Sequence, residues 1–190
     1  MYRGILIAAL FFLSENLFSQ SIHFVKEKIE MTIQDSSFTI KGRYYFLNRN
    51  DKKFITSFFY PFIINNNYKY PDSILILDKN NLPVPYSKNK GGIFFAVKTL
   101  AKDTSEFTAF YRQRNLIKRA EYILTTTQNW NAPLQKAEYI VNLPKYLSLK
   151  SISLQPDSVI NNPAYKTYFI TKENFMPIIN LIVEWKKRKK

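Results

Sequence analysis

Residues 25–46 read VKEKIEMTIQDSSFTIKGRYYF, and this stretch decides the fold class. Apolar side chains recur at every second position in long parts of it, on both sides of a polar turn at residues 34–36. Two runs with a period of two across a short turn predict a β-hairpin with one buried face. The apolar positions are Val25, Ile29, Met31 and Ile33 in the first run and Phe38, Ile40, Tyr44 and Phe46 in the second.

The same alternation returns at residues 137–143 and 179–185. Shorter candidate strands, separated by turns rich in Asn and Pro, are residues 53–60, 73–77, 84–86, 93–99, 106–113 and 165–170. About a dozen strands at this spacing predict an all-β protein, either one antiparallel β-sandwich or two small sandwiches packed together. The side chains expected in the core are Ile29, Met31, Ile40, Tyr44, Phe46, Tyr139, Val141, Leu181 and Val183.

Two segments depart from simple alternation. Apolar residues stand at odd positions 147 and 149 but at even positions 152 and 154, so we expect a β-bulge near residues 150–151. Residues 116–124 also fit a helical stripe, but the threonine-rich run at 122–127 favours a strand. We therefore predict a turn at 115–118 followed by a strand, with a short helix in 115–124 as the alternative.

The first residues have the features of a secretory signal peptide. Arg3 precedes nine apolar residues at positions 5–13, and polar residues follow from Ser14. This apolar run is too short to cross a bilayer, which takes about 20 residues. We expect residues 1–19 to be a signal peptide, with cleavage after Ser19 or after Ser21. The mature protein is then exported to the periplasm or beyond, as one domain at 20–185, a basic tail at 186–190 and no transmembrane span.

The composition argues against most enzyme classes. The chain has no cysteine and one histidine, His23, so thiolate nucleophiles, disulfides and histidine-rich metal sites are excluded. Its four glycines form no phosphate-binding motif, and its carboxylates are scattered along the chain. We therefore expect no enzymatic activity, no cofactor and no metal. A hydrolase built on dispersed carboxylates is the least favoured alternative.

Trp130 and its neighbours Asn129 and Asn131 form the candidate ligand contact. An indole ring flanked by Asn side chains is able to stack on a sugar or on an aromatic group of a peptide. The alternative is a corner tryptophan that folds back on the core. Aromatic doublets at 44–45, 58–59 and 94–95 place one ring on each side of a sheet, so outward rings that lie together would form a second platform.

The chain carries a formal net charge of +14, and five basic residues end it: Lys186, Lys187, Arg188, Lys189 and Lys190. Such a charge suggests an anionic partner. Because export separates the protein from nucleic acid, we expect an anionic envelope surface or another envelope protein as the partner. The tail is expected to leave the sheet after Trp185; its alternative role is to keep the protein soluble and guard the sheet edge.

Two stretches resemble known families. Residues 28–61, which contain KGRYYFLNRNDKKFITSFFYP, and residues 125–144, TTTQNWNAPLQKAEYIVNLP, resemble uncharacterised secreted bacterial β domains with a Tyr/Phe-Pro corner and a Trp-x-x-Pro corner. They are broadly similar to the von Willebrand-associated domain of inter-α-trypsin inhibitor heavy chains as well. The resemblance implies a β-sandwich and transfers no catalytic or binding residue.

Three functional hypotheses follow from the sequence. The first is a non-catalytic envelope module with a structural or protein-binding role. The second is a glycan-binding module that uses outward aromatic residues with Asn and Lys. The third is the hydrolase with dispersed carboxylates, which would need a pair of them facing each other across a cleft.

Overall fold

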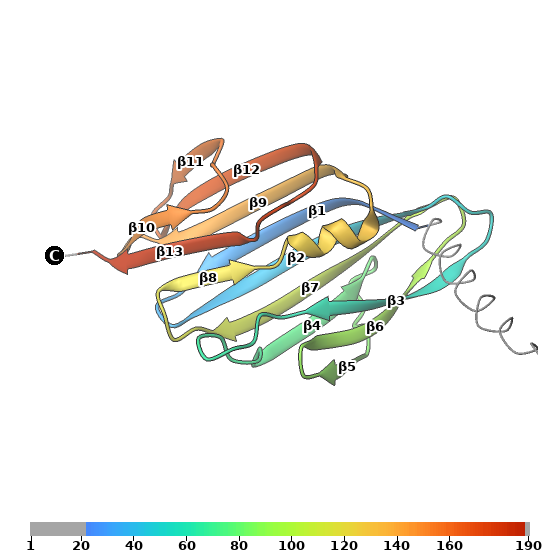
Figure 1. Ribbon diagram of the computed structural model, residues 1–190, viewed down its shortest axis with the longest axis horizontal. Helices are drawn as coiled ribbons and strands as arrows, with labels where there is room; N and C mark the ends of the chain where they lie inside the picture. Colours follow the sequence, from blue (N-terminus) through green and yellow to red (C-terminus); the bar gives the residue numbers. More distant parts are fainter. Residues whose placement is uncertain (1–21, 189–190) are drawn as a thin grey trace, which may run out of the picture.

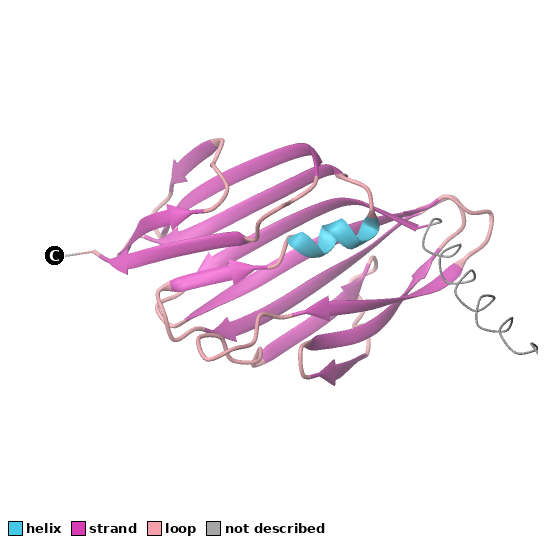
Figure 2. Cartoon of the chain, in the orientation of Figure 1, coloured by secondary structure: helices cyan, strands magenta, loops and turns pink. Residues whose placement is uncertain are grey.

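Residues 22–188 are the part of the chain that the computed structural model describes, and there it has thirteen strands and one short 3₁₀ helix (Figures 1 and 2). The predicted signal peptide and residues 189–190 lie outside this part. The elements are β1 (Ile22–Ile33), β2 (Ser37–Asn48), β3 (Phe54–Pro61), β4 (Ser73–Asp78), β5 (Tyr86–Asn89), β6 (Gly92–Thr99), β7 (Thr104–Arg114), β8 (Arg119–Tyr122), η1 (Thr125–Trp130), β9 (Leu134–Pro144), β10 (Leu147–Ile152), β11 (Ser158–Asn161), β12 (Tyr165–Phe175) and β13 (Leu181–Lys187).

Seven of these strands form one large sheet in the order β11-β12-β9-β1-β2-β7-β4. The predicted hairpin is its centre, where β1 and β2 pair antiparallel. The pairing of β1 with β9 is parallel, which is a departure from the purely antiparallel prediction. The other pairings between described strands are antiparallel. Because the described residues form thirteen strands and one short 3₁₀ helix, the predicted all-β class is confirmed.

Two three-stranded sheets form the second layer over one face of the large sheet (Figure 1). One has the order β10-β13-β8 and the other β3-β6-β5. The buried side chains of both belong to one cluster with those of the large sheet, so these residues form one sandwich and not two. All nine side chains expected in the core are buried, because the alternation places them on the face between the layers.

The segments that depart from simple alternation agree with the predictions in part. The predicted bulge is confirmed, since the register between β10 and β13 shifts between Leu149 and Ser151. Residues 115–118 form the expected turn before β8, and residues 115–124 contain no helix. The strand predicted at 122–127 is wrong, because β8 ends at Tyr122 and Thr125 begins the 3₁₀ helix η1. The candidate strand at 84–86 is displaced, since β5 begins at Tyr86.

The prediction that the chain leaves the sheet after Trp185 is also wrong. Lys186 and Lys187 continue β13, where Lys187 pairs with Leu147 of β10. The ammonium group of Lys187 lies 3.2 Å from a carboxylate oxygen of Asp35, and the backbone N–H of Arg188 donates to the carbonyl of Tyr146. Backbone pairing and a partner for the charge therefore extend the strand beyond its last apolar residue.

Candidate functional site

A cavity of about 470 Å³ lies between the two small sheets. Strands β1, β2 and β7 of the large sheet provide its floor. One wall is β3, at the edge of its sheet, and the other is Tyr122 at the end of β8 together with η1. Nine of the sixteen described residues that line it are aromatic. Two neighbouring sheet edges that do not pair thus leave a pocket lined by rings.

Glu27 is the carboxylate of this cavity, and a bulge places it there. The register between β1 and β2 shifts between Phe24 and Lys26. Before the shift the buried positions of β1 are even, as at Phe24, and after it they are odd, as at Glu27 and Ile29. Bulges redirect side chains in this way and are common near functional sites. The side chain of Glu27 is only 2% exposed, although it is ionisable.

Burial changes the acidity of Glu27. Loss of hydration raises its pKa to about 7, although a hydrogen bond from Tyr139 favours the ionised form. The hydroxyl of Tyr139 donates to Oε1 of Glu27 over 2.6 Å, from the neighbouring strand β9. Glu27 therefore changes its charge near neutral pH, inside an aromatic pocket.

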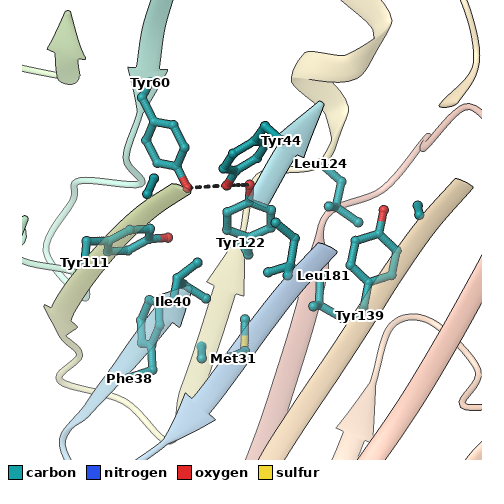
Figure 3. Packing of buried hydrophobic residues seen from close by; sticks show 14 of the residues in the cluster. Met31, Phe38, Ile40, Tyr44, Tyr60, Tyr111, Tyr122, Leu124, Tyr139 and Leu181 are labelled. Carbon is teal, nitrogen blue, oxygen red and sulfur yellow. Dashed lines mark hydrogen bonds between the residues drawn. The ribbon is translucent and has the colours of Figure 1, made fainter. Parts of the chain in front are cut away.

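Three tyrosine hydroxyls meet in the same region (Figure 3). Tyr44 of β2 is hydrogen-bonded to Tyr60 of β3 and to Tyr122 of β8, each over 2.6 Å. Their rings come from both layers, so the hydroxyls tie the large sheet to both small ones. Burial raises the pKa of all three, which keeps them neutral at physiological pH. Each of the three side chains lines the cavity.

Of the three residues of the predicted ligand contact, two line the cavity and one does not. Trp130 ends η1 and is half-buried, with its ring centroid 5.2 Å from that of Phe46 and 6.0 Å from that of Phe24. It lines the cavity, as does the exposed Asn129. Asn131 is exposed, does not line the cavity and adopts φ 52°, where it ends η1. Trp130 thus packs on the core, as the alternative proposed, and also borders a pocket.

The outward aromatic residues do not join into one platform in the part of the chain that is described. Phe59 of β3 and Phe94 of β6 contact each other in a tilted arrangement, with ring centroids 4.7 Å apart. On the outer face of the large sheet, the Lys26 ammonium covers the ring of Tyr45 and the Lys41 ammonium covers that of Phe110. The outward rings of the three doublets are therefore divided between the two layers of the sandwich.

Sequence reasoning missed Glu27, the tyrosine trio and the cavity itself. A signal for Glu27 was present, because it occupies an odd position between Val25 and Ile29, in the apolar phase of the first run. An acidic residue at a position where the alternation places apolar side chains in the core indicates a buried ionisable group. No sequence signal shows that the neighbouring edge strands β3 and β8 do not pair with each other, since strand order depends on contacts between distant segments.

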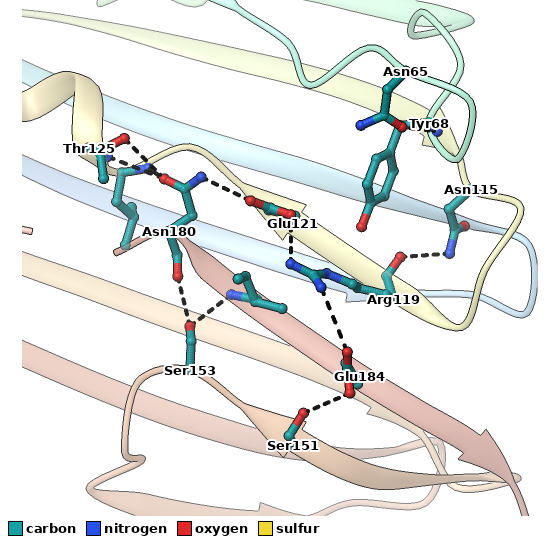
Figure 4. Close-up of polar contacts among 12 residues, drawn as sticks. Asn65, Tyr68, Asn115, Arg119, Glu121, Thr125, Ser151, Ser153, Asn180 and Glu184 are labelled. Atoms are coloured by element: carbon teal, nitrogen blue, oxygen red, sulfur yellow. Dashed lines mark hydrogen bonds and ion pairs between the residues drawn. The ribbon is translucent and has the colours of Figure 1, made fainter. Parts of the chain in front are cut away.

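The carboxylates of β8 and β13 belong to an ion-pair network (Figure 4). The guanidinium of Arg119 lies 3.0 Å from Glu121 and 3.8 Å from Glu184, and Lys150 lies 3.2 Å from Glu184. Hydrogen bonds from Lys150 and Ser151 hold the pKa of Glu184 below its ordinary value. These groups are neutralised by cations, which is the arrangement of a structural network and not of a carboxylate pair across a cleft.

A second cavity, of about 370 Å³, gathers basic side chains near the end of β13. Lys145, Lys166 and Arg188 line it, and no carboxylate is among the described lining residues. Of the three described residues of the predicted tail, 186–188, Arg188 is the one that lines this cavity. Lys189 and Lys190 lie outside the described residues.

Residues 22–188 contain no group of three or more His, Asp or Glu side chains placed to hold a metal ion. No helix in this part of the chain has the length and apolar character needed to cross a membrane.

No protein-family model matches this chain, and no curated protein matches it. Among solved structures, a Legionella pneumophila protein provisionally assigned as a nutrient binding protein is similar, with a TM-score of 0.69 and 15% identity over 87% of this chain and 67% of that protein. An M1 zinc metallopeptidase from Deinococcus radiodurans has a TM-score of 0.55 and 10% identity over 87% of this chain.

The chain spans 42% of the peptidase. At these identities the likeness concerns the fold alone, and it agrees with the β-sandwich of the described residues. The resemblance to von Willebrand-associated domains stays a prediction.

Proposed function

We propose that this protein is an exported, non-catalytic binding module that holds a small organic molecule in the cavity between β3 and η1. The observation that carries the proposal is the cavity itself. Its volume of about 470 Å³ falls in the range of small-molecule sites, and its lining combines many aromatic rings with a few convergent polar groups. Trp130 and Asn129, two of the three predicted contact residues, border it.

Two further points support a binding role over a hydrolytic one. Glu27 is the single carboxylate among the described lining residues, whereas glycoside hydrolysis uses two facing each other. The similar Legionella pneumophila protein is provisionally assigned as a nutrient binding protein, which is compatible with ligand capture. Export rests on the signal-peptide features of residues 1–19.

The test is a thermal-shift screen of the purified protein against a metabolite library, with two variants alongside. Thr126→Trp places an indole in the cavity, because Thr126 lines it from η1. Thr171→Trp makes the same change at an exposed position of β12 that does not line the cavity. We expect compounds that raise the melting temperature of the wild type and of Thr171→Trp but not of Thr126→Trp. Hits that stabilise all three proteins equally, or no hits, would overturn the proposal.

The basic cavity favours a second role, which is contact with an anionic envelope surface. Lys145, Lys166 and Arg188 gather there without a carboxylate among the described lining residues. Cations that lie close together produce a stronger local positive potential than the same charges spread over the surface. This potential attracts anionic lipids or acidic glycans. This contact would hold the module at the envelope while the aromatic cavity binds its ligand.

A further inference from the structure

The aromatic cavity has the opposite electrostatic character to the protein as a whole. The chain carries a net charge of +14. No Lys, Arg or His is among the described residues that line the cavity, and Glu27 is its one acidic residue. An anionic ligand would therefore meet a buried acid and no cation there. A neutral or cationic ligand fits this lining better.

Glu27 is the one buried acidic residue of the surrounding sheets in the described part of the chain. Glu138, on the neighbouring strand β9, lies 3.6 Å from Lys26 and 3.3 Å from Lys136. Glu27 has no ion pair in the described part of the chain, and its hydrogen-bond partner there is the neutral Tyr139. Burying a carboxylate without a cation beside it costs free energy. A positively charged ligand group that reaches the carboxylate therefore binds with a strongly favourable free energy.

The rings around Glu27 provide the other half of a cation site. Phe24, Tyr44 and Phe46 line the floor beside it, and Trp130 borders the cavity at η1. The faces of aromatic rings carry partial negative charge and attract ammonium groups, most strongly where water is excluded. The same rings bury the apolar part of a small molecule.

We propose that the ligand of the aromatic cavity carries a protonated amine that pairs with the Glu27 carboxylate, and an apolar or aromatic body that packs among the rings. This inference rests on the proposed function and names the chemical class of its ligand.

Binding of this kind depends on pH in a defined direction. The groups that face Glu27 are the hydroxyls of Tyr139, Tyr44, Tyr60 and Tyr122, from β9, β2, β3 and β8, and burial raises the pKa of each. All four stay neutral below pH 10, so Glu27 is the group that titrates. Because the amine requires the carboxylate form, affinity increases as the pH rises through 7, the pKa of the free protein.

The test is calorimetric titration of the purified protein with three probes of similar size: 2-phenylethylamine, 2-phenylethanol and phenylacetate. We expect the amine to bind most tightly, with an affinity at about pH 8 that is about tenfold or more above that at about pH 5.5. The Glu27→Gln variant is expected to lose both the preference for the amine and the increase of affinity with pH. Glu30→Gln is the matched control, because Glu30 lies on the same strand, bonds to Asn142 and does not line the cavity.

Each outcome has a separate meaning. Equal or tighter binding of the alcohol or of the carboxylate, abolished by Thr126→Trp, would overturn the amine inference and leave the proposed function standing. Binding of the amine that Glu27→Gln and pH do not change would also overturn it. If no probe binds and the metabolite screen finds no ligand that Thr126→Trp excludes, both proposals fail. The comparison of probes and of pH uses the wild type, so it does not depend on the folding of a variant.

Discussion

The hydroxyl of Tyr44 occupies the space that a side chain at Gly42 would need. Both residues lie on the inner face of β2, two positions apart, so the tyrosine folds back over the glycine. Glycine in the middle of a strand weakens it and often marks a place where another group approaches closely. Here the close approach allows the Tyr44 hydroxyl to meet those of Tyr60 and Tyr122 at the edge of the aromatic cavity.

Gly42→Ala is therefore expected to displace the Tyr44 ring and to break its two hydrogen bonds. We expect the variant to lose about 1–3 kcal/mol of unfolding free energy, as overpacked cores do. Urea denaturation followed by tryptophan fluorescence measures this loss. Gly91→Ala is the control, since its methyl group would meet a single atom, of Phe59, at an ordinary 3.9 Å, and it should change stability by less than about 1 kcal/mol. Equal stability of the two variants would contradict this account of Gly42.

Burial of Glu27 makes the unfolding free energy of the protein depend on pH. The pKa of Glu27 is about 7 in the folded state against 4.5 as the ordinary value, so between these pH values the folded state holds a proton that the unfolded state lacks. The contribution of Glu27 to stability is therefore largest below pH 4.5 and is lost as the pH rises through 7. At higher pH the buried carboxylate costs about 3 kcal/mol.

Glu27→Gln removes this ionisation and keeps an oxygen that can accept from Tyr139. We expect the stability of the variant relative to the wild type to increase between pH 4.5 and 7, by up to about 3 kcal/mol. Denaturant midpoints measured across this range provide the comparison. Parallel curves for the two proteins would show that Glu27 does not titrate in this window.

The hairpin, the bulge in β10 and the core were predictable because they follow from local alternation. The 3₁₀ helix was not predictable, because its start depends on Asn180. The Oδ1 atom of Asn180 accepts hydrogen bonds from the backbone N–H groups of Leu124 and Thr125 and from the Thr125 hydroxyl. That contact spans 55 residues and overrides the strand preference of threonine. In the same way, Glu27 was visible in the apolar phase of β1, but its partner Tyr139 is 112 residues away.

Export is tested by the N-terminus of the protein made in a host with a periplasm. If residues 1–19 act as a signal peptide, intact-mass and N-terminal sequencing should find a periplasmic form that begins at Gln20 or at Ile22. Replacing Leu10 with Arg interrupts the apolar run and should leave the full-length form in the cytoplasm. A wild-type protein that keeps Met1 and stays inside the cell would refute the signal peptide.

The basic cavity predicts weak, salt-sensitive binding to anionic membranes. Each cation near such a surface contributes up to about 1 kcal/mol, so the three in this cavity supply at most about 3 kcal/mol, or on the order of a hundredfold in partitioning. Removing the chain after Trp185 would also shorten β13, so the test uses substitutions.

We expect the triple variant Lys145→Gln, Lys166→Gln and Arg188→Gln to lose most of its sedimentation with phosphatidylglycerol vesicles. The exposed Lys53, Lys69 and Lys90, changed to Gln together, remove the same charge without touching the cavity and should cause a smaller loss. Binding of the wild type should weaken at high salt, because screening shortens the reach of these charges to about 8 Å or less. Equal losses in the two variants would assign the binding to net charge, and binding that survives high salt would exclude an electrostatic contact at this cavity.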